Sequence, residues 1–166
     1  MDPKQIEILI AVVAALGFGG LIGLERQIHS KPAGMRTHML VAGAAALLVS
    51  LDRMLTARFA AEFGNSGVFR SDPIGVMQAV ITAVAFLGAG TIIRQQTGEH
   101  VEGLTTAASL GFTAAIGIAA GLNLWLLAAG CTILVLATLR IGYWVDEWVD
   151  RITGQPSEEE KEAGKS

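Results

Sequence analysis

The sequence predicts an all-α protein: a polytopic transmembrane bundle of about five helices. Of its 166 residues, 52% are hydrophobic and only 16% are charged, whereas soluble domains carry roughly 25% charged residues. Glycine is abundant, at 20 residues, while aromatic residues contribute 6%, and small aliphatic side chains suit close helix–helix contact in lipid. Five apolar stretches approach or reach the roughly 20 residues that cross the hydrocarbon core. These stretches are approximately 6–24, 37–55, 74–93, 103–121 and 124–145.

The first stretch is followed by Glu25-Arg26 instead of a small-residue cleavage site, so we expect a retained helix and not a removed signal peptide. Within it, Ala15, Gly19 and Gly23 recur every four residues, and Gly20 lies beside them. Because glycine and alanine have small or no side chains, residues at that spacing leave a groove into which a neighbouring backbone fits. The first helix therefore has a predicted packing face.

The second stretch is the shortest in its purely apolar part, and it depends on its flanks. After it, apolar residues recur every four positions at Leu51, Leu55, Phe59 and Phe63. This spacing predicts an amphipathic continuation of the second helix. The continuation either lies at the membrane interface as a separate surface helix over 52–63 or stands in water as extra turns, and the sequence leaves both open.

The third stretch begins at Asp72-Pro73, which provides a helix cap and a first-turn proline. Further along, Gly88, Gly90 and Thr91 are compatible with an unwound segment that offers carbonyl groups to an ion. A continuous, tightly packed helix is the alternative, and it is the commoner outcome for such residues.

The fourth stretch carries two rows of small residues at four-residue spacing, which favour packing over a substrate path lined by backbone. One row is Gly103, Ala107, Gly111, Ala115 and Ala119, and the other is Ser109, Thr113, Gly117 and Gly121. At its start, Thr105 and Thr106 are expected to form hydrogen bonds between helices.

After the fifth stretch, the composition turns polar and acidic from Gly154 onward. We therefore predict a membrane domain over residues 1–150 and a disordered tail over 151–166. The single cysteine, Cys131, lies in an apolar stretch and is expected to pack as a small hydrophobic side chain.

An internal similarity links the first and third stretches. Residues 18–27 and 86–95 share the pattern F-x-G-x5-R-Q, and one residue out of register the segment 34–37 resembles 103–106. Two hairpins related by a parallel repeat would produce this pattern. Chance similarity between helices rich in glycine and alanine is the alternative, and the sequence does not decide between them.

Orientation follows from the basic residues, because the cytoplasmic side of a membrane protein keeps the excess of Lys and Arg. With the amino terminus outside, eight of the 12 basic residues fall on the inside and four on the outside. We therefore expect the amino terminus outside and the carboxyl terminus in the cytoplasm.

The charged residues lie near the helix ends and none lies in the middle of an apolar stretch, which is evidence against a conventional cation transporter. Adjacent helical residues do not face one another, so Glu25 and Arg26 are predicted to find their partners on other helices. A network of Glu25 with Arg36 or Arg94 is the expected arrangement, and snorkelling into the headgroups is the alternative. The charged candidates for a functional rim are Glu25, Arg26, Arg36, His38, Asp72 and Arg94.

Other function classes have little support in the sequence. His29, His38 and His100 lack a fixed metal-ligand spacing, and magnesium prefers oxygen ligands, so no metal site and no cofactor are predicted. No nucleophile–base signature is present, which argues against an enzyme. No basic stripe suggests a nucleic-acid partner.

Five motifs occur in one order along residues 16–121. They are Gly20-Leu21-Ile22-Gly23-Leu24-Glu25-Arg26, Ala33-Gly34-Met35-Arg36-Thr37-His38, Asp72-Pro73, Phe86-Leu87-Gly88-Ala89-Gly90-Thr91-Ile92 and Gly103-Leu104-Thr105-Thr106-Ala107-Ala108-Ser109. In these motifs the sequence resembles the membrane domain of the MgtC/SapB family. It departs from the family pattern at Gln27, Gly75 and Gly111, and we expect a short form without the soluble carboxy-terminal domain, about the size of an ACT domain, of MgtC-like members.

The resemblance implies a short-form bacterial inner-membrane protein connected with adaptation to low magnesium and, in pathogens, with survival inside host cells. In that family, the MgtC member is thought to act on the membrane ATP synthase and not to move magnesium itself.

Two functions follow as hypotheses: a regulatory protein that binds another membrane protein, and a transporter or channel for a cation such as Mg²⁺. A continuous polar cavity past Gly88, Gly90 and Thr105 would favour transport, whereas a filled core would count against it. The lipid bilayer is the expected surrounding, and the glycine faces also suit a homo-oligomer.

Overall fold

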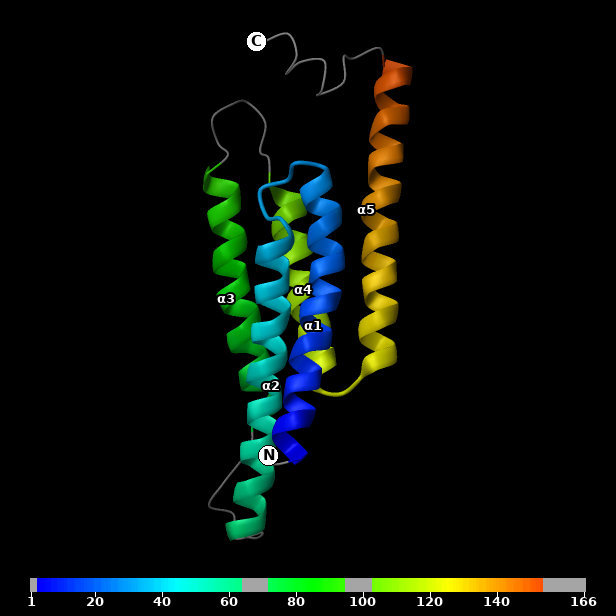
Figure 1. Ribbon diagram of the computed structural model, residues 1–166. Coiled ribbons are helices and arrows are strands. Elements are labelled where there is room, and N and C mark those ends of the chain that lie inside the picture. The colour runs from blue at the N-terminus through cyan, green and yellow to red at the C-terminus, as the bar shows by residue number, and fades with distance from the viewer. Residues whose placement is uncertain (1–2, 64–71, 95–102, 154–166) are drawn as a thin grey trace.

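The computed structural model describes residues 3–63, 72–94 and 103–153, and these form a bundle of helices (Figure 1). Each of the five helices is long and apolar enough to cross a membrane, which confirms the predicted number of spans. The helices are α1 Pro3–Ile28, α2 Met35–Phe63, α3 Pro73–Arg94, α4 Leu104–Gly121 and α5 Trp125–Thr153.

Successive helices run in opposite directions. The end of α1 and the start of α2 therefore lie at one end of the bundle, beside the later half of α5, and we call this end the α1–α2 end (Figure 1). The start of α1 and the α4–α5 turn lie at the opposite end. The hairpins α1–α2 and α3–α4 run in the same sense, as a parallel repeat requires, although the repeat itself stays a prediction. Which end faces the cytoplasm also stays a prediction.

Helix α4 is the centre of the bundle, because it contacts each of the other four helices. Its small residues permit that position. A Cβ at Gly117 would overlap the backbone of Ala42 in α2, and a Cβ at Gly121 would lie 2.7 Å from the carbonyl oxygen of Ala46. The row that ends in these two glycines is the packing face of α4. The other predicted row packs in part. Ala107 lies against Gly88 of α3 and Ala119 is buried in the core, whereas Gly111 has no neighbour within 4 Å of its Cβ position.

The predicted groove on α1 is confirmed. A Cβ at Gly19 would overlap the carbonyl group of His38, and one at Gly23 would lie 2.6 Å from the Cα of Met35. Gly20 meets the side chain of Met39, 3.3 Å from its Cβ position. These contacts bring the backbones of α1 and α2 together near the α1–α2 end.

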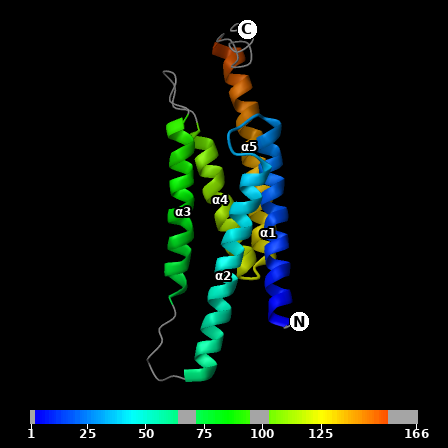
Figure 2. The same cartoon turned by 60° about the vertical axis from the view of Figure 1, so that its left-hand side comes forward.

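The structure decides between the alternatives left open for two helices. Helix α3 is continuous from Pro73 to Arg94, which is the commoner of the two predicted outcomes, and the unwound alternative at Gly88 and Gly90 is wrong. Helix α2 continues through Phe63 along its own direction, past the start of α1 (Figure 2), which favours extra turns over a separate interfacial helix.

Helix α5 continues to Thr153, so the boundary predicted at residue 150 is three residues too early. The helix formers extend up to Gly154, where Gly and Pro interrupt the pattern. The remainder of the predicted tail lies outside the described residues.

The opposite end is closed by the turn between α4 and α5. Asn123 adopts a left-handed conformation with φ of 62°, and the amides of Asn123 and Leu124 donate to the carbonyl groups of Ala120 and Ala119. This pairing is a Schellman motif. The side chain of Arg53 donates to the carbonyl oxygen of Gly121 across 2.9 Å, which satisfies an orphan acceptor at the end of α4.

The tryptophans of α5 mark the thickness of the membrane. Trp125 and Trp144 are nineteen residues apart on one helix, which corresponds to about 28 Å at 1.5 Å per residue. This distance matches the hydrocarbon core of roughly 30 Å, and Trp is enriched at both boundaries of that core. We therefore expect the bilayer boundary at the α1–α2 end to lie near Trp144.

Candidate functional site at the α1–α2 end

Glu25 and Arg26 lie in the last turns of α1 and are buried, with 8% and 1% of their surface exposed. The guanidinium nitrogen Nη1 of Arg26 lies 3.9 Å from Oε2 of Glu25. Among the described side chains, Glu25 and Arg26 therefore contact each other in place of the partners that were predicted on other helices. Burial of both side chains also excludes the snorkelling alternative.

His29 continues this cluster toward the surface. Its Nδ1 lies 3.3 Å from Oε1 of Glu25 and 2.9 Å from the carbonyl oxygen of Glu25. The His29 ring stacks on Tyr143 of α5 with ring centres 3.9 Å apart and planes 9° apart. The ammonium group of Lys31 lies 5.9 Å from the centre of the same tyrosine ring. Together these contacts connect α1, the α1–α2 loop and α5.

The cluster contains buried polar atoms that lack hydrogen bonds. Both carboxylate oxygens of Glu25 and Nε of Arg26 are buried and have no hydrogen-bond partner. Burying an ion costs several kcal/mol unless charge pairing and hydrogen bonds compensate. The contacts of Glu25 with Arg26 at 3.9 Å and with His29 at 3.3 Å compensate only in part, so this end of the bundle holds ionisable side chains in an unfavourable environment.

His38 is the third predicted residue that the structure brings here. It is fully buried at the start of α2 and packs against α1 at Gly23. Its Nδ1 donates to the carbonyl oxygen of Gly34 across 3.0 Å. Its Nε2 lies 3.2 Å from Oγ of Ser109 in α4. The Ser109 hydroxyl can donate either to that nitrogen or to the carbonyl oxygen of Thr106, 2.8 Å away.

Replacement of Ser109 by alanine is expected to destabilise the protein by about 1–3 kcal/mol, because Nε2 of buried His38 would lose its partner. Thermal unfolding of the purified protein in mild detergent measures the effect. Thr113→Val is the matched control, since the Thr113 hydroxyl donates within α4 to the carbonyl oxygen of Ser109 and valine keeps the shape. An equal loss in both variants would show that the contact with His38 contributes nothing of its own.

The other charged candidates lie apart from this cluster. Arg36 is exposed, so it is not the predicted partner of Glu25, and the side chain of Arg94 lies outside the described residues. Asp72 is at the opposite end, where its Oδ1 accepts the amide of Gly75 across 3.0 Å and caps α3. Including Asp72 in a common rim was wrong, because an antiparallel bundle places the start of α3 away from the start of α2.

The residues proposed for an ion path do not line a common cavity. A Cβ at Gly88 would lie 3.1 Å from the Cβ of Ala107, so α4 fills that position, whereas Gly90 is exposed with nothing within 4 Å. Thr105 is exposed, while Thr106 is buried. The hydroxyl of Thr91 donates to the carbonyl oxygen of Gly88 within α3. Gly90 and Thr105 therefore face out of the bundle.

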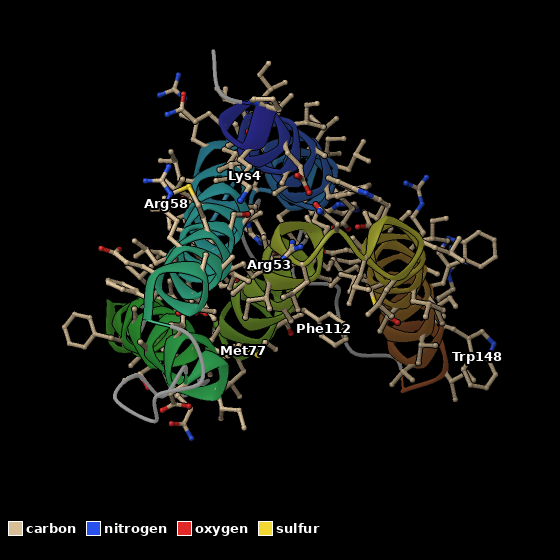
Figure 3. All side chains as sticks on the ribbon, turned by 90° about the horizontal axis from the view of Figure 1, so that it is seen from below. Lys4, Arg53, Arg58, Met77, Phe112 and Trp148 are labelled. Atoms are coloured by element: carbon tan, nitrogen blue, oxygen red, sulfur yellow. The ribbon has the colours of Figure 1, made fainter. Side chains whose placement is uncertain are left out.

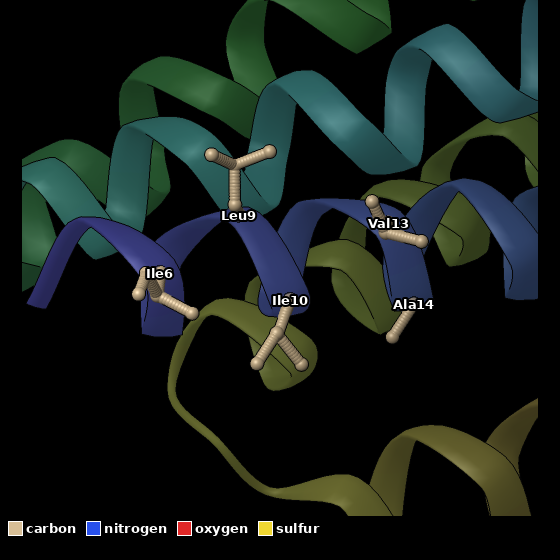
Figure 4. Close-up of a pocket in the computed structure, with 5 residues that line it drawn as sticks. All are labelled: Ile6, Leu9, Ile10, Val13 and Ala14. Atoms are coloured by element: carbon tan, nitrogen blue, oxygen red, sulfur yellow. The ribbon is translucent and has the colours of Figure 1, made fainter. Parts of the chain in front are cut away.

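Two pockets lie elsewhere. An apolar groove of about 440 Å³ runs along the first half of α1 (Figure 4), on a surface that lipid tails would cover. A smaller pocket of about 190 Å³ lies between α2 and α3 near Asp52 and Arg53, at the opposite end. Neither is lined by the glycines of α3 or by the charged cluster.

Comparison with known proteins places the chain in a family. Residues 12–148 match the MgtC family. The chain is 36% identical over 128 residues to protein MgtC of Salmonella typhimurium, which covers 77% of this chain and 49% of that protein. It is 32% identical over 140 residues to the putative magnesium transporter YhiD of Escherichia coli, covering 81% and 60%.

An uncharacterized protein of Haemophilus influenzae is 33% identical over 150 residues, covering 90% of this chain and 61% of that protein. The chain thus spans about half to three fifths of the length of these curated relatives. No solved structure matches the chain.

Proposed function

Because the chain belongs to the MgtC family, we propose that it is a regulatory protein of the bacterial inner membrane that binds another membrane protein during adaptation to low magnesium. It would act by binding and not by catalysis. The family resemblance supplies the link to magnesium. With the amino terminus outside, the α1–α2 end would face the cytoplasm.

The observation that carries this proposal is the filled interior. Gly19 and Gly23 bring α1 onto α2, and Gly117 and Gly121 bring α4 onto α2, so main-chain atoms occupy the space between the three core helices. Backbone contact of this kind leaves no room for a hydrated ion between these helices. The interior therefore supports binding over transport.

The α1–α2 end provides side chains that would bind the proposed partner protein. Glu25 and Arg26 lack hydrogen bonds at both carboxylate oxygens and at Nε, and Glu25 is covered by His29, which stacks on Tyr143. A partner that displaces this cover would supply the missing bonds and lower the cost of the buried charges. Lys31 lies beside the same cover and adds a positive charge for an acidic partner surface.

The second candidate function is cation transport. It is favoured by the buried carboxylate of Glu25, whose two oxygens accept no hydrogen bond, and by the similarity to the putative magnesium transporter YhiD of Escherichia coli. Intramembrane carboxylates often mark ion pathways.

Magnesium flux and growth separate the two functions. We expect liposomes that contain the purified protein to take up Mg²⁺ no faster than empty liposomes, while the same protein restores growth in low-magnesium medium to a strain that lacks its own copy. Lys31→Glu is expected to reduce growth without lowering the unfolding temperature, and Lys4→Glu at the opposite end is the control. Mg²⁺ uptake that Glu25→Gln abolishes would establish transport in place of regulation.

A further inference from the structure

Helix α5 is attached to the bundle along one side only. Its buried residues are Ala128, Thr132, Val135 and Leu139, and it contacts α4 and α1. The opposite side of α5 faces away from the other helices, as the labelled side chain of Trp148 shows in Figure 3. This outward side is therefore available to a neighbour.

The outward side carries a heptad pattern, which we call the α5 seam. Its residues follow one another at alternating steps of three and four, and each is exposed or half-exposed. They are Leu127, Gly130, Leu134, Ala137, Ile141, Trp144 and Trp148. Three heptads of this spacing form the contact stripe of a coiled coil. Gly130 and Ala137 alternate with larger residues, which allows two helices to approach closely.

The seam continues beyond the membrane. Tyr143 stacks on His29 at the end of α1, and α5 runs on for ten more residues, or about 15 Å. Figure 1 shows this part of α5 extending past the other helices. Trp148 and Ile152 lie on it and are 65% and 64% exposed. We expect lipid tails to cover the seam up to Trp144 but not to reach Ile152, which leaves this apolar side chain exposed to water in a single copy of the chain.

We propose that a second copy of the chain covers the α5 seam, in a parallel dimer of the two α5 helices. A partner helix must cross the bilayer and project by the same length on the same side. A second copy inserted in the same orientation meets this requirement at the same depth. A two-fold axis along the membrane normal then brings each seam residue onto its own counterpart.

Disulfide cross-linking in membrane vesicles tests the arrangement. In a Cys131→Ala background, Ile141→Cys lies on the seam, and Gly142→Cys is also exposed but turned about 100° around the helix. We expect oxidation to convert the 141 variant to a covalent dimer at least tenfold faster than the 142 variant. Ala137→Cys and Trp148→Cys are expected to follow the 141 variant. Equal rates at 141 and 142, or no dimer at any seam position, would overturn the proposal.

Gly130→Leu supplies an independent test. Because nothing lies within 4 Å of a Cβ at Gly130, leucine leaves the fold of one chain intact but fills the space that the second helix needs. Native mass spectrometry from lipid nanodiscs is expected to show dimers for the original chain and at least a tenfold smaller dimer fraction for Gly130→Leu, at the same unfolding temperature. An unchanged dimer fraction would contradict the seam.

Discussion

Replacement of Gly117 by leucine is expected to destroy the native contact between α4 and α2. Even a Cβ at this position would overlap the carbonyl oxygen of Ala42, and it would lie 2.9 Å from the Cβ of Ala45. Overpacking a close-packed contact typically costs about 1–3 kcal/mol and sometimes more. Since backbone atoms cannot move aside without separating the two helices, we expect a loss of about 3 kcal/mol or more.

Gly111→Leu is the matched control, because Gly111 lies on the same helix and a Cβ there meets nothing within 4 Å. Both variants add the same side chain to α4, so they differ only in the surface that receives it. Thermal unfolding followed by size-exclusion chromatography in mild detergent measures both. We expect Gly111→Leu to keep a sharp monodisperse peak and the unfolding temperature of the original chain. A similar loss of stability in the two variants would mean that any leucine added to α4 destabilises the protein, and that the close contact between α4 and α2 is not the cause.

The two glycines also show what the sequence can and cannot predict. Hydropathy identifies stretches that contact lipid, so the five spans were predictable. The four-residue spacing located both rows of small residues on α4, but spacing does not fix how a helix is rotated about its axis. That rotation depends on neighbours such as Ala42 and Ala46, which is why only the structure distinguishes the packed Gly117 from the open Gly111.

Helix ends were less predictable than helix centres. Outside the membrane, the hydropathy signal is lost, and the extensions of α2 to Phe63 and of α5 to Thr153 depend on local helix formation and side-chain contacts. The four-residue apolar spacing beyond Leu51 did indicate the first extension. In α5, Trp144 and Trp148 have the same four-residue spacing, so the sequence also indicated the second extension.

The charged site was predicted only in part: Glu25, Arg26 and His38 were found, Arg36 and Asp72 were wrongly included, and the contacts within the site were not predicted. Polar residues at the end of an apolar helix are conspicuous, so Glu25 and Arg26 could be found. The contact of Glu25 with His29 follows from a spacing of four residues, which the sequence displays. Tyr143 carries no such signal, because its approach to His29 depends on how α5 docks against α1.

Removal of Glu25 alone is expected to be the most damaging change at this site. Glu25→Leu would leave Arg26, which is 1% exposed, as a buried charge without its neighbouring carboxylate. Breaking a buried ion pair from one side typically costs about 3–5 kcal/mol, whereas replacing both partners by apolar residues is often neutral or stabilising. We therefore expect Glu25→Leu to cost about 3–5 kcal/mol and the double variant Glu25→Leu/Arg26→Leu to recover most of that loss.

A double-mutant cycle measured by thermal unfolding distinguishes the role of this pair in stability from its role in function. Recovery of stability in the double variant without recovery of growth in low magnesium would show that the charges are retained for binding and not for folding. This outcome is expected because both carboxylate oxygens of Glu25 and Nε of Arg26 form no hydrogen bond. If instead the stability lost in the double variant equals the sum of the losses in the two single variants, the residues act independently, and the 3.9 Å contact does not couple them.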